Sequence, residues 1–287
     1  MSNVGPAKSS QTATNREQIY TCGYSSASMQ IMASRTAEVH AKFLLPHLRP
    51  GMRVLDCGCG PGSITVGLAK AVAPGEAVGI DLEPTQLDLA RAHAAEQAVT
   101  NVRFEVDNIG ALSFLDGEFD AVFGHTILMQ FQDPMPALAE VRRVLKSGGV
   151  AGFREPIFSS NLAEPPDSAQ DQLWKLFGRV LAYNGGDIDI GRRLPRLLQS
   201  TGFGRLTMSA SFSGGWTPEA KRAFYERYAE LCDEADFIKQ AIALGWIGSD
   251  VPATMMATLR AEASDPLSFF ATAWREIVAW KLAQPGR

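Results

Sequence analysis

The sequence predicts a doubly wound α/β fold, in which a mostly parallel β-sheet is covered by helices on both faces. Two observations between residues 51 and 156 support this prediction. Short segments rich in β-branched residues alternate with longer helical segments, and the connections between them are short. Repeated β-α-β units give parallel strands, and the ligands of such sheets bind outside the carboxyl ends of the strands.

The elements of this region can be assigned from their hydrophobic patterns. Strands are expected at residues 53–57, 77–81, 102–106, 119–124 and 150–155. Helices are expected at residues 63–73, 84–97 and 134–145. The first helix carries Ile64, Leu68 and Val72 on one face, and the second has Pro84 in its first turn.

Helical segments flank this region on both sides. Residues 28–48 are expected to form a helical arm before it. After it, we expect helices at residues 168–183, 194–200 and 218–263, and a strand at 205–212. Residues 269–282 suit either a helix or a strand. We expect a strand at the edge of the sheet, because large apolar residues recur there: Phe270, Trp274, Val278 and Trp280.

The composition excludes several classes of protein. The 287 residues are 46% hydrophobic and 20% charged, as in soluble globular proteins, and the net charge of −4 with dispersed basic residues argues against a nucleic-acid partner. The four cysteines form neither a secreted disulfide framework nor a zinc motif, so we expect no metal site. No apolar segment approaches the ~20 residues of a membrane span. We expect a cytoplasmic protein whose first fifteen or so residues are mobile.

A glycine-rich loop follows the first expected strand. In VLDCGCGPGS, Gly58, Gly60 and Gly62 let the backbone turn sharply and approach a ligand. The loop is not the dinucleotide fingerprint G-x-G-x-x-G, because Ser63 occupies its third glycine position. It is not a phosphate-binding P-loop either, since no G-K-[ST] follows.

Three aspartates stand at successive strand ends around this loop. Asp81 is suited to accept hydrogen bonds from both ribose hydroxyls of a nucleoside, and Asp107 from an adenine amino group, with Asn108 and Ile109 beside the ring. Asp56 would repel a pyrophosphate but attract the ammonium group of a methionine moiety. Together they predict a cationic nucleoside ligand. The alternative is that the aspartates cap helices or end solvated loops.

With these motifs the sequence resembles the class I S-adenosylmethionine methyltransferases. More narrowly, it is similar to the group of ubiquinone/menaquinone C-methyltransferases and natural-product methyltransferases. The resemblance covers about residues 35–156 and is carried by VLDCGCGPG, GIDLEP, FEVDN, FDAVFGHTIL and LKSGGVAGFREP. It implies that the three loop glycines wrap the methionine part, Asp81 holds the ribose and Asp107 meets the adenine. The residues expected to contact S-adenosyl-L-methionine are Asp56, Gly58, Gly60, Gly62, Asp81, Leu82, Asp107, Asn108, Ile109, Gly124, Tyr24 and Arg35.

The resemblance also implies a Rossmann-like methyltransferase fold with a seven-stranded, mostly parallel sheet. Residues 1–50 would form a flexible tail and the helical arm, and residues 51–156 the cofactor-binding core. Residues 157–287 would complete the sheet and add a helical lid that binds the substrate. An arm that closes a pocket can also exchange between subunits, so a homo-oligomer is compatible with this arrangement.

Two residues are candidates for the chemistry. Methyl transfer depends mainly on positioning and exclusion of water, and needs a general base only where the acceptor must lose a proton. His125 follows the fourth strand and has an unperturbed pKa of ~6.5, so it suits a base; alternatively it orders the loop or contacts the cofactor. Glu155 is expected at the pocket rim as a base or acceptor ligand, unless Arg154 neutralises it. Gln130 stands where related sequences often carry a second histidine.

The chain outside the core is rich in aromatic residues and suggests a lid over an apolar acceptor pocket. Tyr24 and Arg35 of the arm would reach the methionine carboxylate, unless they are ordinary packing residues. The predicted function is methyl transfer to carbon, oxygen or nitrogen of a small, largely apolar acceptor, releasing S-adenosyl-L-homocysteine. The alternatives are a nicotinamide-dependent oxidoreductase and a non-catalytic cofactor-binding homologue. The candidate lid residues are Trp174, Phe177, Tyr183, Trp216, Phe224, Tyr225, Tyr228, Phe237, Trp246, Met255 and Met256.

Overall fold

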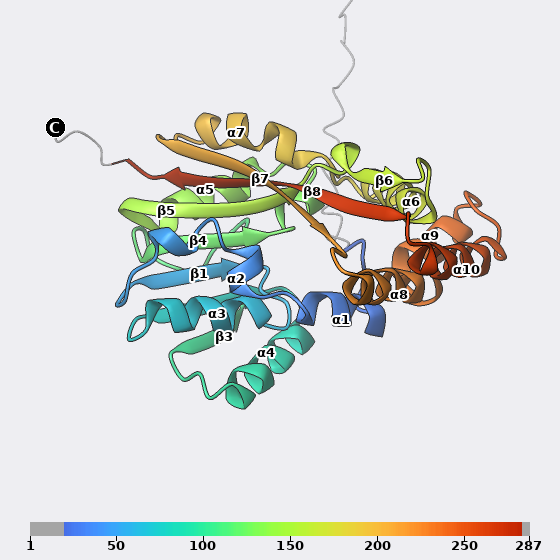
Figure 1. The fold of residues 1–287 in the computed structure, drawn as a ribbon. Helices are drawn as coiled ribbons and strands as arrows, with labels where there is room; N and C mark the ends of the chain where they lie inside the picture. The colour runs from blue at the N-terminus through green and yellow to red at the C-terminus, as the bar shows by residue number, and fades with distance from the viewer. Residues whose placement is uncertain (1–19, 283–287) are drawn as a thin grey trace, which may run out of the picture.

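An eight-stranded sheet forms the centre of the computed structural model, which describes residues 20–282 (Figure 1). The expected mobile first residues lie outside the described part. The strand order is β3-β2-β1-β4-β5-β8-β6, and β7 pairs with β8. Strands β1 to β5 are parallel, whereas β8 runs antiparallel to β5, β6 and β7. The strands are β1 (Arg53–Cys57), β2 (Glu76–Asp81), β3 (Val102–Val106), β4 (Phe119–His125), β5 (Leu145–Pro156), β6 (Leu162–Glu164), β7 (Leu206–Gly214) and β8 (Phe269–Trp280).

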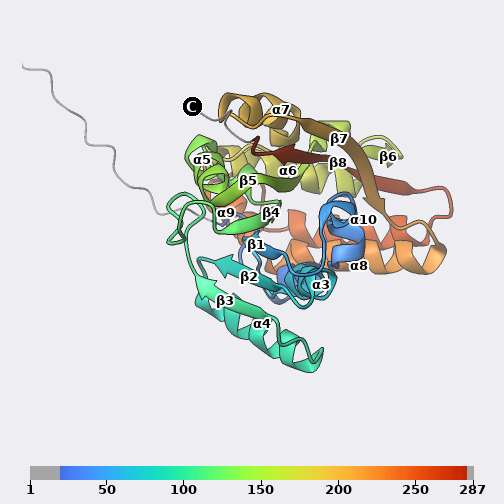
Figure 2. The same ribbon diagram turned by 90° about the vertical axis from the view of Figure 1, so that its left-hand side faces the viewer.

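Helices cover both faces of this sheet, as the doubly wound prediction requires. Helices α3 and α4 pack through apolar side chains on one face, and α5 and α7 pack on the other (Figure 2). Helices α8, α9 and α10 gather at one end of the sheet, next to α1 (Figure 1). The helices are α1 (Ser26–Ala33), α2 (Ala37–His40), α3 (Ser63–Val72), α4 (Pro84–Glu96), α5 (Met135–Val144), α6 (Ala169–Tyr183), α7 (Ile190–Ser200), α8 (Pro218–Glu234), α9 (Asp236–Ala243) and α10 (Val251–Ser264), with 3-10 turns η1 (Leu45–His47), η2 (Leu128–Gln130) and η3 (Phe158–Ser160).

Strand β8 confirms the strand expected near residues 269–282, but the expected edge position is wrong. It pairs with β5 on one side and with β7 on the other, and most of its residues are buried on both faces. Its large apolar residues therefore fit a strand with two covered faces. The expected count of seven strands is also too low, because the three-residue strand β6 extends the sheet beside β8. A strand that short leaves no readable pattern in the sequence.

The helical arm expected over residues 28–48 is divided into two short helices and a 3-10 turn. Helix α1 ends at Ala33, and α2 begins at Ala37. Thr36 between them is extended, with φ of −137°, and Pro46 lies in the 3-10 turn η1. A β-branched residue and a proline within one segment disfavour an unbroken helix. Within residues 20–282, none of the helices combines the length and apolar character that crossing a bilayer requires.

Candidate functional site

Two adjoining cavities open at the carboxyl ends of the parallel strands. The first has a volume of about 260 Å³ and is bordered by the loops that follow β1, β2, β3 and β4. The second has a volume of about 420 Å³ and lies between the arm, α6, α8 and β8. The two meet at five shared wall residues: Tyr20, Met32, Arg35, Thr126 and Gln130. The site therefore has room for two molecules side by side.

The glycine loop after β1 forms one wall of the first cavity, as expected. Gly60 has φ of +51° and donates its backbone N–H to Oδ2 of Asp81 at 2.9 Å. The other carboxylate oxygen of Asp81 accepts from the N–H of Glu83 at 3.0 Å. Burial raises the pKa of Asp81, and these backbone hydrogen bonds oppose the rise. The loop thus fixes a carboxylate at the end of β2, with Leu82 beside it in the cavity wall.

Two glycines predicted to contact the ligand pack against protein instead. Gly62 has φ of +74°, and a Cβ there would lie 2.7 Å from Cβ of Ala90 in α4. A Cβ on Gly124 would lie 3.0 Å from Ile127 and from Phe153. Neither glycine lines a cavity. Both positions therefore need glycine because neighbouring elements approach closely.

Asp56 lies beneath the glycine loop, at the end of β1. Its side chain is buried, and Thr65 of α3 donates a hydrogen bond of 2.6 Å to Oδ2. Burial raises the pKa of Asp56 to about 7, while the bond from Thr65 acts to lower it. Asp56 borders a small recess of the site together with Arg35 and His125. The recess therefore brings one carboxyl group together with a guanidinium group and an imidazole.

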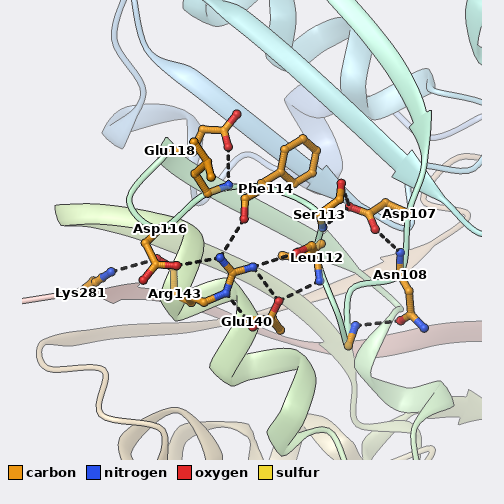
Figure 3. A network of polar contacts seen from close by, with 12 residues as sticks. Asp107, Asn108, Leu112, Ser113, Phe114, Asp116, Glu118, Glu140, Arg143 and Lys281 are labelled. Atoms are coloured by element: carbon orange, nitrogen blue, oxygen red, sulfur yellow. Dashed lines mark hydrogen bonds and ion pairs between the residues drawn. The ribbon is translucent and has the colours of Figure 1, made fainter.

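Asp107 stands at the start of the loop that joins β3 to β4. Its carboxylate accepts hydrogen bonds from the N–H of Asn108 at 2.8 Å and from the N–H and hydroxyl of Ser113 at 3.0 Å each (Figure 3). Asp107 and Ile109 line the first cavity. Asn108 is exposed, and its side chain accepts from the N–H of Gly110 at 2.8 Å, so it shapes the turn.

Arg143 of α5 secures the rest of this loop. Its guanidinium donates to the carbonyls of Leu112 and Phe114 at 2.9 and 2.8 Å (Figure 3). It also pairs with Asp116 and Glu140 at 2.8 Å each. Glu140 in turn accepts from the N–H of Leu112 at 2.8 Å. The segment that carries Asp107 is thus bound to a helix of the core.

His125 ends β4 and borders the first cavity with a side chain that is only 6% exposed. Its Nδ1 lies 3.0 Å from the carbonyl oxygen of Arg154. A carbonyl can only accept, so Nδ1 carries the proton and Nε2 of the neutral ring has a free lone pair. Burial, assisted by Arg35 and Arg154, keeps the pKa of His125 well below its usual value. The ring also packs 5.2 Å from His40 of the arm.

Glu155 does not reach the pocket rim where it was expected. It is fully buried, and its carboxylate accepts from the backbone N–H groups of Ile127, Leu128 and Met129 at 3.0, 2.8 and 3.3 Å. Burial raises the pKa of Glu155 to about 8, and the three N–H groups oppose the rise. The expected neutralisation by Arg154 is also wrong, because adjacent strand residues point to opposite faces. Arg154 pairs instead with Glu276 at 3.4 Å.

The structure adds wall residues that the sequence did not identify. Thr126 borders both cavities and has φ of +56°, a strained conformation for a β-branched residue. Its hydroxyl lies 3.4 Å from Nη1 of Arg35. Tyr20 stacks on the predicted Tyr24 with ring centroids 5.0 Å apart, and both line the first cavity. Positive φ at a threonine has no sequence signal, whereas Tyr20 could have been chosen with Tyr24 from its place in the arm.

About half of the predicted lid residues line the second cavity. Its aromatic wall also includes Phe158, Phe212 and Trp274, from outside the predicted set. Of the other candidates, Tyr183 packs on Trp246 at 5.6 Å, and Met255 belongs to the core. The predicted residues that line the cavity are Trp174, Phe177, Trp216, Phe224, Tyr228 and Phe237.

The glycine loop and the carboxylates of Asp81 and Asp107 thus border one cavity of an α/β protein, and a largely apolar second cavity adjoins it. A family model described as a methyltransferase domain matches residues 48–185. The Aspergillus luteorubrus protein ltbC, described as a probable methyltransferase, is 32% identical over 94% of this chain and 99% of its own length. The chain therefore belongs to the methyltransferase family.

The chain is also similar to a second named methyltransferase and to a solved structure. Aklanonic acid methyltransferase DauC of Streptomyces sp. strain C5 is 29% identical over 177 residues, which cover 57% of this chain and 80% of that protein. The crystal structure of the [4+2]-cyclase SpnF has a TM-score of 0.53 at 23% identity and covers 89% of this chain and 80% of that one. At that identity the likeness concerns the fold alone, which hosts more than one chemistry.

Proposed function

We propose that the protein is an S-adenosylmethionine-dependent methyltransferase acting on a small, largely apolar acceptor. The observation that carries the proposal is the Asp81 carboxylate, which the glycine loop holds at the wall of the first cavity. The residues present fit the cofactor: Gly58 and Gly60 line the cavity without a Cβ, and carboxylates stand at three strand ends. When bound, S-adenosylmethionine supplies a methyl group on an electrophilic sulfonium.

The binding roles follow from the charges around the first cavity. Asp81 accepts hydrogen bonds from the ribose hydroxyls, while Asp107 and Ile109 meet the adenine. Asp56 and Arg35 border the same small recess, and their opposite charges suit the ammonium and carboxylate ends of an amino acid. Tyr24 covers the opening beside Asp81.

The second cavity holds the acceptor next to the first. Its aromatic wall excludes water and suits a flat apolar molecule. Where the acceptor must lose a proton, we assign His125 as the base, since Nε2 of the neutral ring is free to take it. Carbon, oxygen and nitrogen all remain candidates for the methylated atom.

Two observations about the chain as a whole support the proposal. The relatives ltbC and DauC carry methyltransferase names, and the name of DauC gives a natural-product-like acid as its substrate. The division into an arm (1–50), a cofactor core (51–156) and a substrate lid (157–287) accounts for the two cavities. A binding role without catalysis stays the alternative, because the fold also hosts a cyclase.

Calorimetric titration with S-adenosylhomocysteine tests the proposal. We expect micromolar binding to the native protein and loss of detectable binding in Asp81→Ala. Asp88→Ala is the matched control, because Asp88 lies exposed on α4 and pairs only with Arg91. Binding of NAD in place of S-adenosylhomocysteine would assign the glycine loop to the nicotinamide-dependent oxidoreductases and overturn the proposal.

A further inference from the structure

Among residues 20–282, the wall of the second cavity contains positively charged side chains but no negatively charged ones. Its walls contain the guanidinium groups of Arg35 and Arg227 and the ring of His40, but neither aspartate nor glutamate. The remaining wall is formed by aromatic, aliphatic and small neutral polar side chains. An apolar cavity with two cations and no anion is costly, because desolvated charges need partners.

Neither cation is neutralised by another part of the described chain. Within residues 20–282, Arg227 of α8 forms no ion pair and no side-chain hydrogen bond, although it is half-buried. Arg35 is bonded only to the hydroxyl of Thr126, at 3.4 Å. By contrast, Arg260 on the neighbouring helix α10 pairs with Glu226 of α8 at 2.5 Å. Arg227 and Arg35 thus face the cavity without an ion-pair partner among residues 20–282.

Tyr228 shows that both cations act on one place in the cavity. Burial raises the pKa of Tyr228 to about 12, and the positive charges of Arg35 and Arg227 both act to lower it. The Tyr228 ring packs 5.4 Å from Trp174 and 4.6 Å from Phe224, so an aromatic surface continues from the charged end. Within the described chain the Tyr228 hydroxyl forms no side-chain hydrogen bond.

We propose that the acceptor of this methyltransferase is an aromatic carboxylic acid, bound as its anion. Its ionised oxygen lies at Arg227 beside the Tyr228 hydroxyl, at the end of the cavity away from the cofactor, and its rings lie against Trp174 and Phe224. A guanidinium group offers paired N–H donors that match a carboxylate, and such charge-assisted bonds are stronger than neutral ones. That the bound anion is the methyl acceptor rests on the proposed function. The anion site itself follows from the residues that line the cavity.

A panel of matched ligands tests the charge preference. The probes are benzoate, 2-naphthoate and anthracene-2-carboxylate, each compared with its neutral carboxamide by calorimetric titration with and without saturating S-adenosylhomocysteine. We expect at least one acid to bind about tenfold or more tightly than its amide, as a charge-assisted bond predicts. No preference for the acid on any of the three ring systems, including no binding at all, would overturn the proposal.

Substitutions on α8 assign the preference to one residue. Arg227→Gln is expected to abolish the preference for the acid and to leave S-adenosylhomocysteine binding unchanged, whereas Arg227→Lys retains part of the preference. Arg222→Gln is the control, because Arg222 is exposed on the same helix outside this cavity. An equal loss in Arg222→Gln would contradict the proposal. The native protein could also bind the acid through Arg227 and fail to bind S-adenosylhomocysteine. That result would refute the proposed function but would still support the anion site.

Discussion

The protonation state of single residues decides what this site can do. His125 is neutral because burial and two nearby guanidinium groups disfavour its charged form. The carbonyl of Arg154 fixes which ring nitrogen carries the proton. Asp56 and Glu155 are carboxyls whose pKa values burial raises to about 7 and about 8. Because these groups titrate in different pH ranges, each is expected to affect activity or stability at a different pH.

His125→Gln tests the role of the histidine as a base. We expect kcat to fall by about 10²–10⁴-fold, the usual contribution of a general base. Because the pKa of His125 lies well below its usual value, the ratio of kcat between the native enzyme and His125→Gln is expected to stay constant from pH 7.5 to 6. Initial rates measured across this range, together with binding of S-adenosylhomocysteine, test both points.

A structural role of His125 predicts a different outcome. If the ring only orders the loop after β4, His125→Gln weakens S-adenosylhomocysteine binding and lowers the melting temperature, with little change in kcat. Unchanged binding with a large loss of kcat supports the base.

Glu155→Gln tests the carboxylate that holds the η2 turn. We expect the free energy of unfolding to fall by about 1–3 kcal/mol at pH 5, because an amide cannot accept all three backbone hydrogen bonds. The folded-state pKa of about 8 lies above the unfolded value. The folded protein therefore binds more protons in the range between the two values, and native stability decreases as pH rises through that range.

Urea unfolding of both proteins at several pH values between 5 and 8 measures this effect. The part of the pH dependence that comes from this carboxyl disappears in the variant, so the stability difference narrows as pH rises. Glu164→Gln, at an exposed position in β6, serves as the control. A stability difference that stays constant with pH would show that Glu155 is ionised throughout.

Among the elements, the loop between β3 and β4 depends most on one distant residue. Arg143 lies in α5, yet it bonds two carbonyls and one carboxylate of the loop, while Glu140 of the same helix pairs with it. The loop carries Asp107 and Ile109 into the first cavity. Its position is therefore set in part by contacts with α5.

Arg143→Gln is expected to weaken S-adenosylhomocysteine binding about threefold to tenfold, because the adenine end of the site loses its support. Calorimetry measures the affinity, and hydrogen exchange of residues 107–118 is expected to rise. Arg142→Gln is the matched control, since Arg142 bonds only the carbonyl of Gly202. Equal exchange of the loop in both variants would show that Arg143 does not hold it.

The elements of the parallel core could be predicted from the sequence, because each has a clear hydrophobic period. The elements before and after the parallel core were harder to predict from the sequence. The break in the arm depends on Thr36 and Pro46, whose effects compete with a helical pattern. The interior position of β8 depends on pairing with β5 and β7, which are distant in sequence. Pairing partners at long range leave no local signal.

The residues of the candidate site also divide into those that the sequence pattern predicts and those that depend on contacts distant in sequence. Gly58, Gly60, Asp81, Asp107 and Ile109 line the first cavity because they follow strands, a position that the pattern predicts. Glu155 also ends a strand, but its face of the sheet was not evident from the sequence. The second cavity draws on eight separate segments, from Tyr20 in the arm to Trp274 in β8, so its wall could be predicted only in part.

Across the whole molecule, β8 links the parallel strands β1 to β5 to the rest of the chain. It pairs with β5 of the core on one side and with β7 on the other, and Trp274 within it borders the second cavity. Helices α8, α9 and α10 lie between β7 and β8 in the sequence. The elements around the first cavity and those around the second are therefore joined through one sheet, and unfolding of either group would disturb the pairing of β8.

We expect the protein to unfold in a single cooperative transition, although chains of this length often do not. Differential scanning calorimetry checks this through the agreement of calorimetric and van't Hoff enthalpies. Saturating S-adenosylhomocysteine is expected to shift the whole transition upward. Two transitions, with only one shifted by the ligand, would show that the core and the lid are independent units.

The place of β8 at the end of the described chain has a consequence for synthesis. A nascent chain emerges from the ribosome with β1 to β5 complete, but the partner of β5 is made only after all the lid helices. Until then β5 is an open sheet edge, and its buried residues from Val150 to Phe153 are ready to pair with another chain. Folding of this protein in the cell therefore depends on shielding that edge while about one hundred further residues are translated.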